Sequence, residues 1–354
     1  MSYVSQRFII NSTAPKDING SKWLSRENNL QSILNITLPI LLTFTVFGCM
    51  ANSIVCWIIW KKRELHTPTF YLIMNMAISD CAILCMSSLQ LLNDYTLLRL
   101  KIRPQEIKFI IFCRLLPIFC LTAYISSTFT LAAISIERFY SISSWSNNKS
   151  YFNTRKKLRL VIGFSWLVGI IVASPFAAIV TVPGRFPWIC IIVKINIVLS
   201  SIYFLTLFLI AYLCPLVVMV IMYTKIILFL RSHFVIHQQN DLKTYQANKK
   251  RHIRIVKKLI LLTSLFLTLS FPLFFLYLLM GFSGKSSYNF LKIKNPRNII
   301  LSEVGFLLTV VSCLQNPLLY FSFNPAFRKA ITINCLCYQR SKRQISVKSA
   351  PGGS

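Results

Sequence analysis

The amino-acid sequence predicts an all-α membrane protein, a seven-transmembrane helix bundle with a short amphipathic eighth helix after it. Composition is the first observation, because 55% of the 354 residues are hydrophobic and only 14% are charged, whereas roughly a quarter of the residues in a soluble domain are charged. The second is that apolar stretches long enough to cross a bilayer as helices recur along the chain. The third is that many basic residues lie between those stretches.

Residues 1–33 are polar and are expected to form an extracellular N-terminal tail. Asn11 and Asn19 each begin an Asn-X-Ser/Thr sequon, so we expect both to be glycosylated. No cleavable signal peptide is expected, because no apolar core precedes a small-residue cleavage site.

Residues 34–323 contain the apolar stretches and are expected to form the bundle. The predicted spans are 34–60, 69–95, 109–142, 157–182, 195–231, 251–281 and 298–323. An odd number of crossings places the two ends of the chain on opposite faces of the membrane. The loops on the same side of the membrane as the C-terminus carry more Lys and Arg than those on the other side. The positive-inside rule therefore predicts a multi-pass plasma-membrane protein with its N-terminus outside and its C-terminus inside.

Residues 324–354 are expected to form the amphipathic helix and a cytoplasmic tail. Phe327 and Ile331 share one face of this helix, with basic residues beside them, which is typical of a helix that lies in the interface and contacts membrane lipids. Cys335 and Cys337 follow and are candidates for lipidation by palmitoylation, with unmodified thiols as the alternative.

The stretch from Cys113 to Tyr140 is predicted to be the central helix. At about 1.5 Å per residue, a helix from Cys113 to Arg138 is roughly 37 Å long, a little more than the hydrocarbon thickness of a bilayer. Small and polar side chains form one face, at Pro117, Cys120, Tyr124, Ser127, Leu131 and Arg138. A helix surrounded by lipid needs no such face. This span is therefore expected to contact a ligand at its outer end and a partner at its inner end.

Asp80 lies in the middle of the second span, where a carboxylate costs roughly 2.5 to 3.5 kcal/mol on insertion scales. It needs polar partners, and residues at comparable depths are Asn52, Ser127, Ser312 and Asn316. Oxygen ligands of this kind suit a small hard cation, so an allosteric sodium ion is the candidate for this site. A water-filled polar network without an ion is the alternative.

Short motifs occur in order along the chain, one set in each span. They are Gly48-x-x-x-Asn52, Ser79-Asp80, Glu137-Arg138-Phe139, Trp166, Pro215 with Tyr223, Phe266 with Pro272, and Asn316-Pro317-Leu318-Leu319-Tyr320. Each motif alone is a weak signal. Together they cover nearly the whole chain, and they resemble the rhodopsin-like, or class A, family of G-protein-coupled receptors.

The resemblance implies a disulfide and a G-protein partner. Cys113 at the outer end of the third span would bond to Cys190 in the second outer loop and tether that loop over the bundle. Arg138 would pair with Glu137 at rest and meet a heterotrimeric G protein when the receptor is active, because a guanidinium can exchange one partner for another.

The resemblance also implies a switch in the inner half of the bundle. Asn316, Pro317 and Tyr320 would form a kinked segment that repacks on activation, with Tyr223 reaching toward it. A ligand outside would then favour the arrangement in which the inner end of the sixth span moves away from Arg138.

Two departures from the family pattern concern the sixth span. Ser270 stands where members usually carry a Trp, two residues before Pro272, so Phe266, Phe271 or Tyr124 is expected to act in place of that Trp. No acidic residue lies between residues 247 and 258, so a salt bridge from this segment to the third span is not expected. We therefore expect a weakly locked resting state with measurable basal signalling.

The resemblance disfavours two ligand classes. Receptors for biogenic amines in this family place an Asp in the third span where Cys120 stands here. Opsins bind retinal through a Lys in the seventh span, and residues 299–323 contain none, so no cofactor is expected. By helical phase the ligand pocket is predicted to include Gln90, Asp94, Cys120, Tyr124, Phe274, Tyr277, Glu303 and Phe306. Aromatic walls with a few polar groups suit a peptide or a small organic ligand.

Basic residues surround the predicted pocket and favour an anionic ligand or an acidic peptide, drawn in by electrostatic steering. They are Lys101, Arg103, Lys108, Arg114, Arg185, Lys194, Lys285, Lys292, Lys294 and Arg297. A neuropeptide is the first interpretation, and a chemosensory small molecule is the second.

Other classes of protein fit the sequence less well. A transporter or channel is the main alternative, but the two halves show no repeat symmetry of the kind common in transporters. An enzyme is disfavoured, since no Ser/His/Asp set and no metal-ligand cluster is apparent among only four histidines. Nucleic-acid binding is not expected despite the net charge of +30, because the basic residues do not gather on a soluble face.

Overall fold

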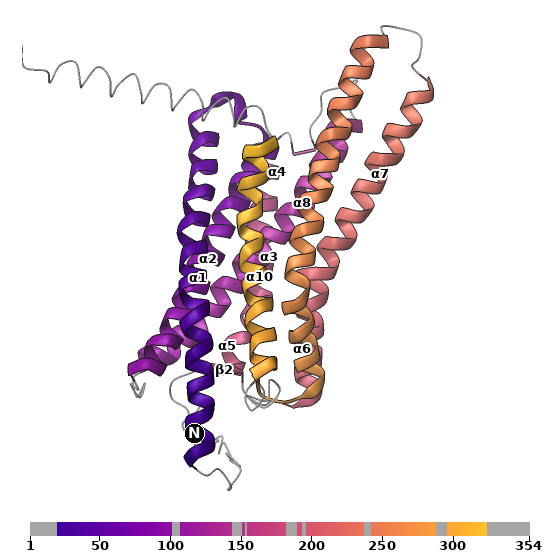
Figure 1. The fold of residues 1–354 in the computed structure, drawn as a ribbon. Coiled ribbons are helices and arrows are strands. Elements are labelled where there is room, and N and C mark those ends of the chain that lie inside the picture. Colours follow the sequence, from indigo (N-terminus) through magenta and orange to yellow (C-terminus); the bar gives the residue numbers. More distant parts are fainter. Residues whose placement is uncertain are drawn as a thin grey trace, which may run out of the picture.

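The computed structural model describes residues 20–100, 107–143, 151–152, 154–181, 190–192, 196–236, 242–287 and 296–323 (Figure 1). In this part of the chain, seven helical stretches are long and apolar enough to cross a membrane. They are Gln31–Lys61, Pro68–Leu100, Phe112–Ser143, Arg155–Ile179, Ile197–Leu230, Thr263–Ser283 and Ile300–Leu318. Each overlaps one of the predicted spans, so the predicted all-α bundle is confirmed.

The helices that contain these stretches extend beyond them. The elements are α1 (Gly20–Lys61), the short turn η1 (Arg63–Leu65), α2 (Pro68–Leu100), α3 (Ile107–Ser143), α4 (Arg155–Ala173), α5 (Phe176–Ile179), β1 (Val180–Thr181), β2 (Ile191–Ile192), α6 (Ile197–Phe208), η2 (Leu209–Leu213), α7 (Cys214–Ile236), α8 (Leu242–Ser283) and α10 (Pro296–Phe323). Helix α1 includes residues 20–33, which composition assigns to the tail. No glycine or proline interrupts residues 21–38, so the backbone can stay helical up to the membrane.

Helix α3 is the centre of the bundle. It packs against α2 and α4 along its length and also contacts α5, α7 and α8. On its small and polar face, Tyr124, Ser127 and Leu131 are buried, and Pro117, Cys120 and Arg138 are partly buried. The predicted position of the third span is therefore correct, and its polar face lies against other helices.

Wide helical geometry joins α6 to α7. Residues Leu209–Leu213 form a π-helical turn immediately before Pro215. A proline ring clashes with the carbonyl four residues earlier, and a wider turn relieves that clash. The Tyr212 hydroxyl in this turn donates a hydrogen bond of 3.2 Å to the carbonyl of Leu267 in α8. That carbonyl lies one turn before Pro272, so the contact fastens α8 close to its own proline.

A small hairpin follows α5 and lies at the same end of the bundle as the N-terminal part of α1 (Figure 1). Val180 pairs with Ile192 and Thr181 pairs with Ile191, in antiparallel register. Cys190 is bonded to Cys113 of α3, as predicted, and it anchors the second strand of the hairpin to the bundle. At the opposite end, the C-terminal half of α7 and the N-terminal half of α8 extend beyond the other helices (Figure 1).

The crossing of α3 and α4 supplies a prediction about packing. A Cβ atom at Gly169 would lie 2.7 Å from the Thr122 carbonyl oxygen, which is backbone and cannot rotate away. Gly169→Ala should therefore push the helices apart and destabilise the purified protein by roughly 1–3 kcal/mol, which lowers its thermal midpoint. Gly163→Ala on the same helix is the matched control, because nothing lies within 4 Å of its Cβ position. Equal midpoints for the two variants would contradict this packing.

Candidate functional site

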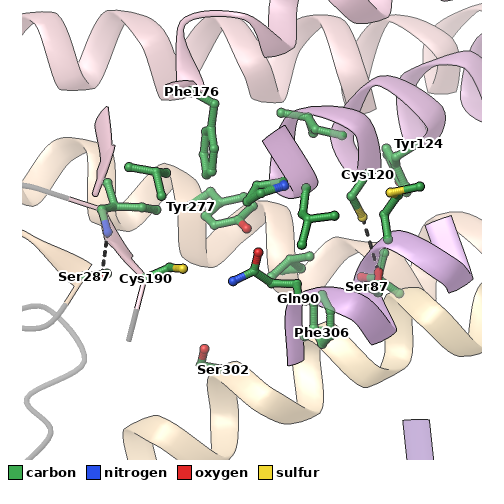
Figure 2. Close-up of a pocket in the computed structure, with 18 of the residues that line it drawn as sticks. Ser87, Gln90, Cys120, Tyr124, Phe176, Cys190, Tyr277, Ser287, Ser302 and Phe306 are labelled. Atoms are coloured by element: carbon green, nitrogen blue, oxygen red, sulfur yellow. Dashed lines mark hydrogen bonds between the residues drawn. The ribbon is translucent and has the colours of Figure 1, made fainter. Parts of the chain in front are cut away.

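A cavity of about 290 Å³ lies beneath the hairpin, between α2, α3, α8 and α10 (Figure 2). Of the predicted pocket residues, those that line it are Gln90, Asp94, Cys120, Tyr124, Phe274, Tyr277 and Phe306. Glu303 does not line it, although it lies on α10 next to Ser302, which does. Helical phase alone therefore brought most of the predicted positions to one cavity.

Aromatic side chains form the inner end of the cavity. Tyr124 of α3 is only 3% exposed and stacks on Phe266, with ring centroids 5.5 Å apart, and packs against Phe274 at 4.7 Å. Ser270, in the place of the usual Trp, is buried and donates to the Phe266 carbonyl at 2.8 Å. Ser270 is too small to fill the volume of a Trp side chain. The stacked rings of Tyr124 and Phe266 pack instead where α3 meets α8.

Polar groups occupy the outer half of the cavity, on α2. The Gln90 side-chain amide donates to both carboxylate oxygens of Asp94, at 3.2 Å and 3.1 Å. Glu303 interacts electrostatically with Asp94 from α10. Deeper in the cavity, the Ser87 hydroxyl and the Cys120 thiol are 3.3 Å apart (Figure 2). A pair of neutral side chains thus lies at the depth where biogenic-amine receptors of the family that the sequence resembles carry an Asp.

The outer cover of the cavity consists mostly of residues that sequence analysis did not single out. Phe176, Cys190 and Ile192 line it from α5 and the hairpin. The Ile192 amide donates to the Ser287 hydroxyl at 3.1 Å, which fastens the hairpin to the segment after α8. Only the predicted disulfide pointed to this cover, because the strands are two residues long and carry no strand pattern of their own.

The buried carboxylate of Asp80 has two neutral donors. Ser127 donates to Oδ1 at 3.1 Å and Asn316 donates to Oδ2 at 2.7 Å. The other two predicted partners bind elsewhere. Asn52 donates to the carbonyls of Gly48 and Cys313, and Ser312 donates to the Thr309 carbonyl of its own helix.

The oxygen atoms near Asp80 fit a sodium ion if one amide rotates. The Oδ1 atoms of Asn52 and Asn316 are buried and have no hydrogen-bond partner among the described residues. Turning the Asn316 amide would present its oxygen to an ion held by Asp80 and Ser127. Sodium binding remains a prediction, with the hydrated network as its alternative.

The inner end of α3 carries the predicted switch residues. Glu137 is 2% exposed and accepts a 3.2 Å hydrogen bond from the Phe152 backbone amide. The hydroxyl of Tyr223 on α7 lies close to Thr263 of α8 and interacts electrostatically with Arg138. Tyr223 is thus close to Arg138 and α8. Its approach to the segment of Asn316, Pro317 and Tyr320 on activation stays a prediction.

Several predicted features lie outside the described residues. They are the sequons at Asn11 and Asn19, the eighth helix, Cys335 and Cys337, and the side chain of Tyr320. Pro317 is described and lies inside α10.

The fold and these sites are those of a seven-helix membrane receptor. A family model described as "7 transmembrane receptor (rhodopsin family)" matches residues 51–320. The chain therefore belongs to the rhodopsin family of seven-transmembrane receptors, which are multi-pass proteins of the plasma membrane and not enzymes.

Individual relatives are distant. The chain is 27% identical to "Rhodopsin, GQ-coupled" of Mizuhopecten yessoensis, over 84% of this chain and 60% of the relative. It is 25% identical to "Tachykinin-like peptides receptor 86C" of Drosophila melanogaster, over 82% of this chain and 58% of the relative. It is 23% identical to "Pyroglutamylated RF-amide peptide receptor" of Rattus norvegicus, over 89% of this chain and 72% of the relative. The chain thus spans about three fifths of the length of the first two relatives.

Among solved structures, the chain resembles the crystal structure of squid rhodopsin. The TM-score is 0.68 at 20% identity, and the match covers 90% of each chain. At this level of identity the likeness concerns the fold alone. Residues 299–323 contain no Lys, so the similarity to rhodopsins does not extend to a Schiff-base lysine in this span.

Proposed function

We propose that this chain is a receptor that transmits the binding of an extracellular ligand to a heterotrimeric G protein, with its N-terminus outside and its C-terminus inside. The observation that carries the proposal is that one helix, α3, joins three sites. Tyr124 closes the cavity, Ser127 binds Asp80 about one turn farther along, and Arg138 lies in the last two turns of the helix, at the face where α7 and α8 extend. From Tyr124 to Arg138 the helix rises roughly 21 Å.

A peptide is the ligand class that the comparisons favour. Two of the three relatives described above are named as peptide receptors, and the third is named as a rhodopsin, whose lysine this chain lacks. The cavity of about 290 Å³ under the hairpin could also hold one end of a peptide while the rest of the peptide stays outside the bundle. A chemosensory small molecule remains the second candidate.

The contacts around α8 support a mechanism by population shift. A ligand group that enters the cavity contacts Phe274 and Tyr277 and displaces the stack of Tyr124 on Phe266. Since α8 contains Pro272, it can change its bend there and move its inner half away from Arg138. Basic segments on that face would complement acidic surfaces of a G protein and of lipid headgroups.

The receptor proposal is tested with a peptide library in cells that carry a promiscuous G-protein reporter. We expect at least one peptide to raise the second messenger in cells that express this chain and not in mock-transfected cells. The same cells should show no new ion conductance under voltage clamp, which separates a receptor from a channel. Conductance without any second-messenger response would refute the proposal.

A further inference from the structure

We infer that the ligand presents a cation to the outer half of the cavity, a guanidinium or an ammonium carried on an apolar body, and that Asp94 pairs with it. This inference rests on the proposed receptor function, because it names the class of ligand for the same cavity. It stands against an anionic ligand, which the basic residues of the outer segments favour in the sequence.

Asp94 and Gln90 present hydrogen-bond acceptors to the cavity. The Gln90 side-chain amide donates its N–H groups to the two carboxylate oxygens of Asp94. Its own Oε1 atom is buried and has no partner among the described residues. The Cys190 backbone amide also donates to the Asp94 carboxylate. A carboxylate accepts about four hydrogen bonds, so Asp94 can still accept a further one. A guanidinium or an ammonium carries only donors and complements this set, whereas a ligand carboxylate would add acceptors to acceptors.

The charges around the cavity have the same sign. Asp94 lines it, and Glu303 interacts electrostatically with Asp94 from α10. Among the described residues that line the cavity there is no Lys or Arg. Negative charges on Asp94 and Glu303 would repel in a site partly shielded from water, and a cation bound at Asp94 would reduce that repulsion.

The deeper part of the cavity fits the apolar body of such a ligand. Figure 2 shows the Gln90 amide and the Tyr277 hydroxyl pointing toward the same space, with Phe176 on one side and Phe306 on the other. At the inner end, the Tyr124 hydroxyl is buried and has no hydrogen-bond partner among the described residues. Its side chain is 3% exposed, so this orphan hydroxyl marks a position where a polar ligand atom can bind.

The basic side chains that the structure describes near the rim of the cavity do not neutralise the negative charge of Asp94 and Glu303. Arg114 donates from Nε to the Val180 carbonyl at 3.2 Å, which supports the hairpin from outside. Lys285 is exposed after α8. Neither residue lines the cavity. The other basic residues predicted at the rim lie outside the described ranges or have undescribed side chains.

The test uses the purified full-length receptor in lipid nanodiscs without a G protein. An equimolar library of tetrapeptide amides forms one arm and a set of small aromatic amines and aromatic acids forms the other. Retained compounds are counted by mass spectrometry. We expect cationic compounds to be enriched, and peptides with arginine to be retained about 10- to 100-fold better than the same peptides with neutral citrulline. The arm that is enriched tells whether the cation belongs to a peptide or to a small amine.

Variants of the receptor assign the preference to one residue. Asp94→Asn should abolish the difference between arginine and citrulline, while Asp94→Glu, which keeps the charge, should retain it. Glu64→Gln is the matched control, because Glu64 is exposed in η1, far from the lining residues. Should Asp94→Asn fail to fold, the arginine and citrulline pairs on the unmodified receptor and on Asp94→Glu still decide the matter.

Enrichment of acidic or neutral compounds, equal retention of arginine and citrulline peptides, or retention of no compound would each overturn the inference. So would an unchanged preference in a folded Asp94→Asn receptor. Because no G protein is present, the proposed function can fail separately. A receptor that retains cations but activates no G protein refutes the signalling role and leaves the cation site standing.

Discussion

Replacing Cys113 with serine is expected to remove most of the receptor from the cell surface. Its disulfide to Cys190 spans 77 residues of sequence. Closing a loop of this length stabilises the folded chain by roughly 4 kcal/mol in the chain-entropy model, which is a large share of the roughly 5–15 kcal/mol available to a typical protein. The same bond holds the hairpin over the cavity, so any receptor that does fold should also lose ligand retention.

The measurement is the ratio of surface to total receptor by antibody labelling. Cys190→Ser should give the same loss, and the double variant should be no worse, because one bond is removed in all three cases. Cys214→Ser is the control, since Cys214 is exposed and free. If the surface-to-total ratio of the double variant fell twice as far as that of either single variant, each cysteine would act on its own and not through the disulfide.

The central helix and most of the cavity were predictable from the sequence. A polar face on an apolar span must lie against protein, so the recurrence of Cys120, Tyr124 and Ser127 was enough to place α3 inside the bundle. The same periodicity brought seven of the eight predicted pocket positions to one cavity. Glu303 does not line this cavity, because phase within a helix does not determine how that helix is rotated against its neighbours.

The partners of Asp80 were only half predictable. Depth in the membrane correctly grouped it with Ser127 and Asn316. Ser312 and Asn52 lie at a similar depth, but each has a backbone carbonyl three or four residues earlier in its own helix, and each donates to it. Local acceptors of this kind compete with any partner across the bundle, and sequence spacing does not tell which acceptor is preferred.

Contacts that depend on backbone irregularities escaped prediction. Tyr212 reaches the Leu267 carbonyl because the turn before Pro215 is π-helical, which rotates the side chains relative to a regular helix. The proline itself was visible in the sequence, but a proline is compatible with a kink, a wide turn or a helix end. The hairpin strands are equally short and irregular, and their position follows from the disulfide and from Ser287.

Arg138→Gln is expected to abolish signalling without removing the cavity. Arg138 is half-buried at the inner end of α3 and interacts electrostatically with Tyr223, which lies close to Thr263 of α8. The buried carboxylate of Glu137 accepts a hydrogen bond from the Phe152 amide, and that bond does not depend on the side chain at residue 138. The neutral amide should therefore leave the fold intact and remove the group expected to meet the G protein.

The measurement needs no ligand, because a weakly locked receptor should signal at rest. Agonist-free second-messenger output should exceed that of mock-transfected cells in the unmodified receptor and fall to the mock value in Arg138→Gln, at equal surface expression. Arg155→Gln is the matched control, since Arg155 is an exposed arginine at the start of α4. Tyr223→Phe keeps the ring but removes the hydroxyl that is close to Thr263 of α8, so its basal output should rise if that contact holds α8 at rest. A fall instead would mean that Tyr223 supports the active arrangement, and the resting lock would have to lie elsewhere on α8.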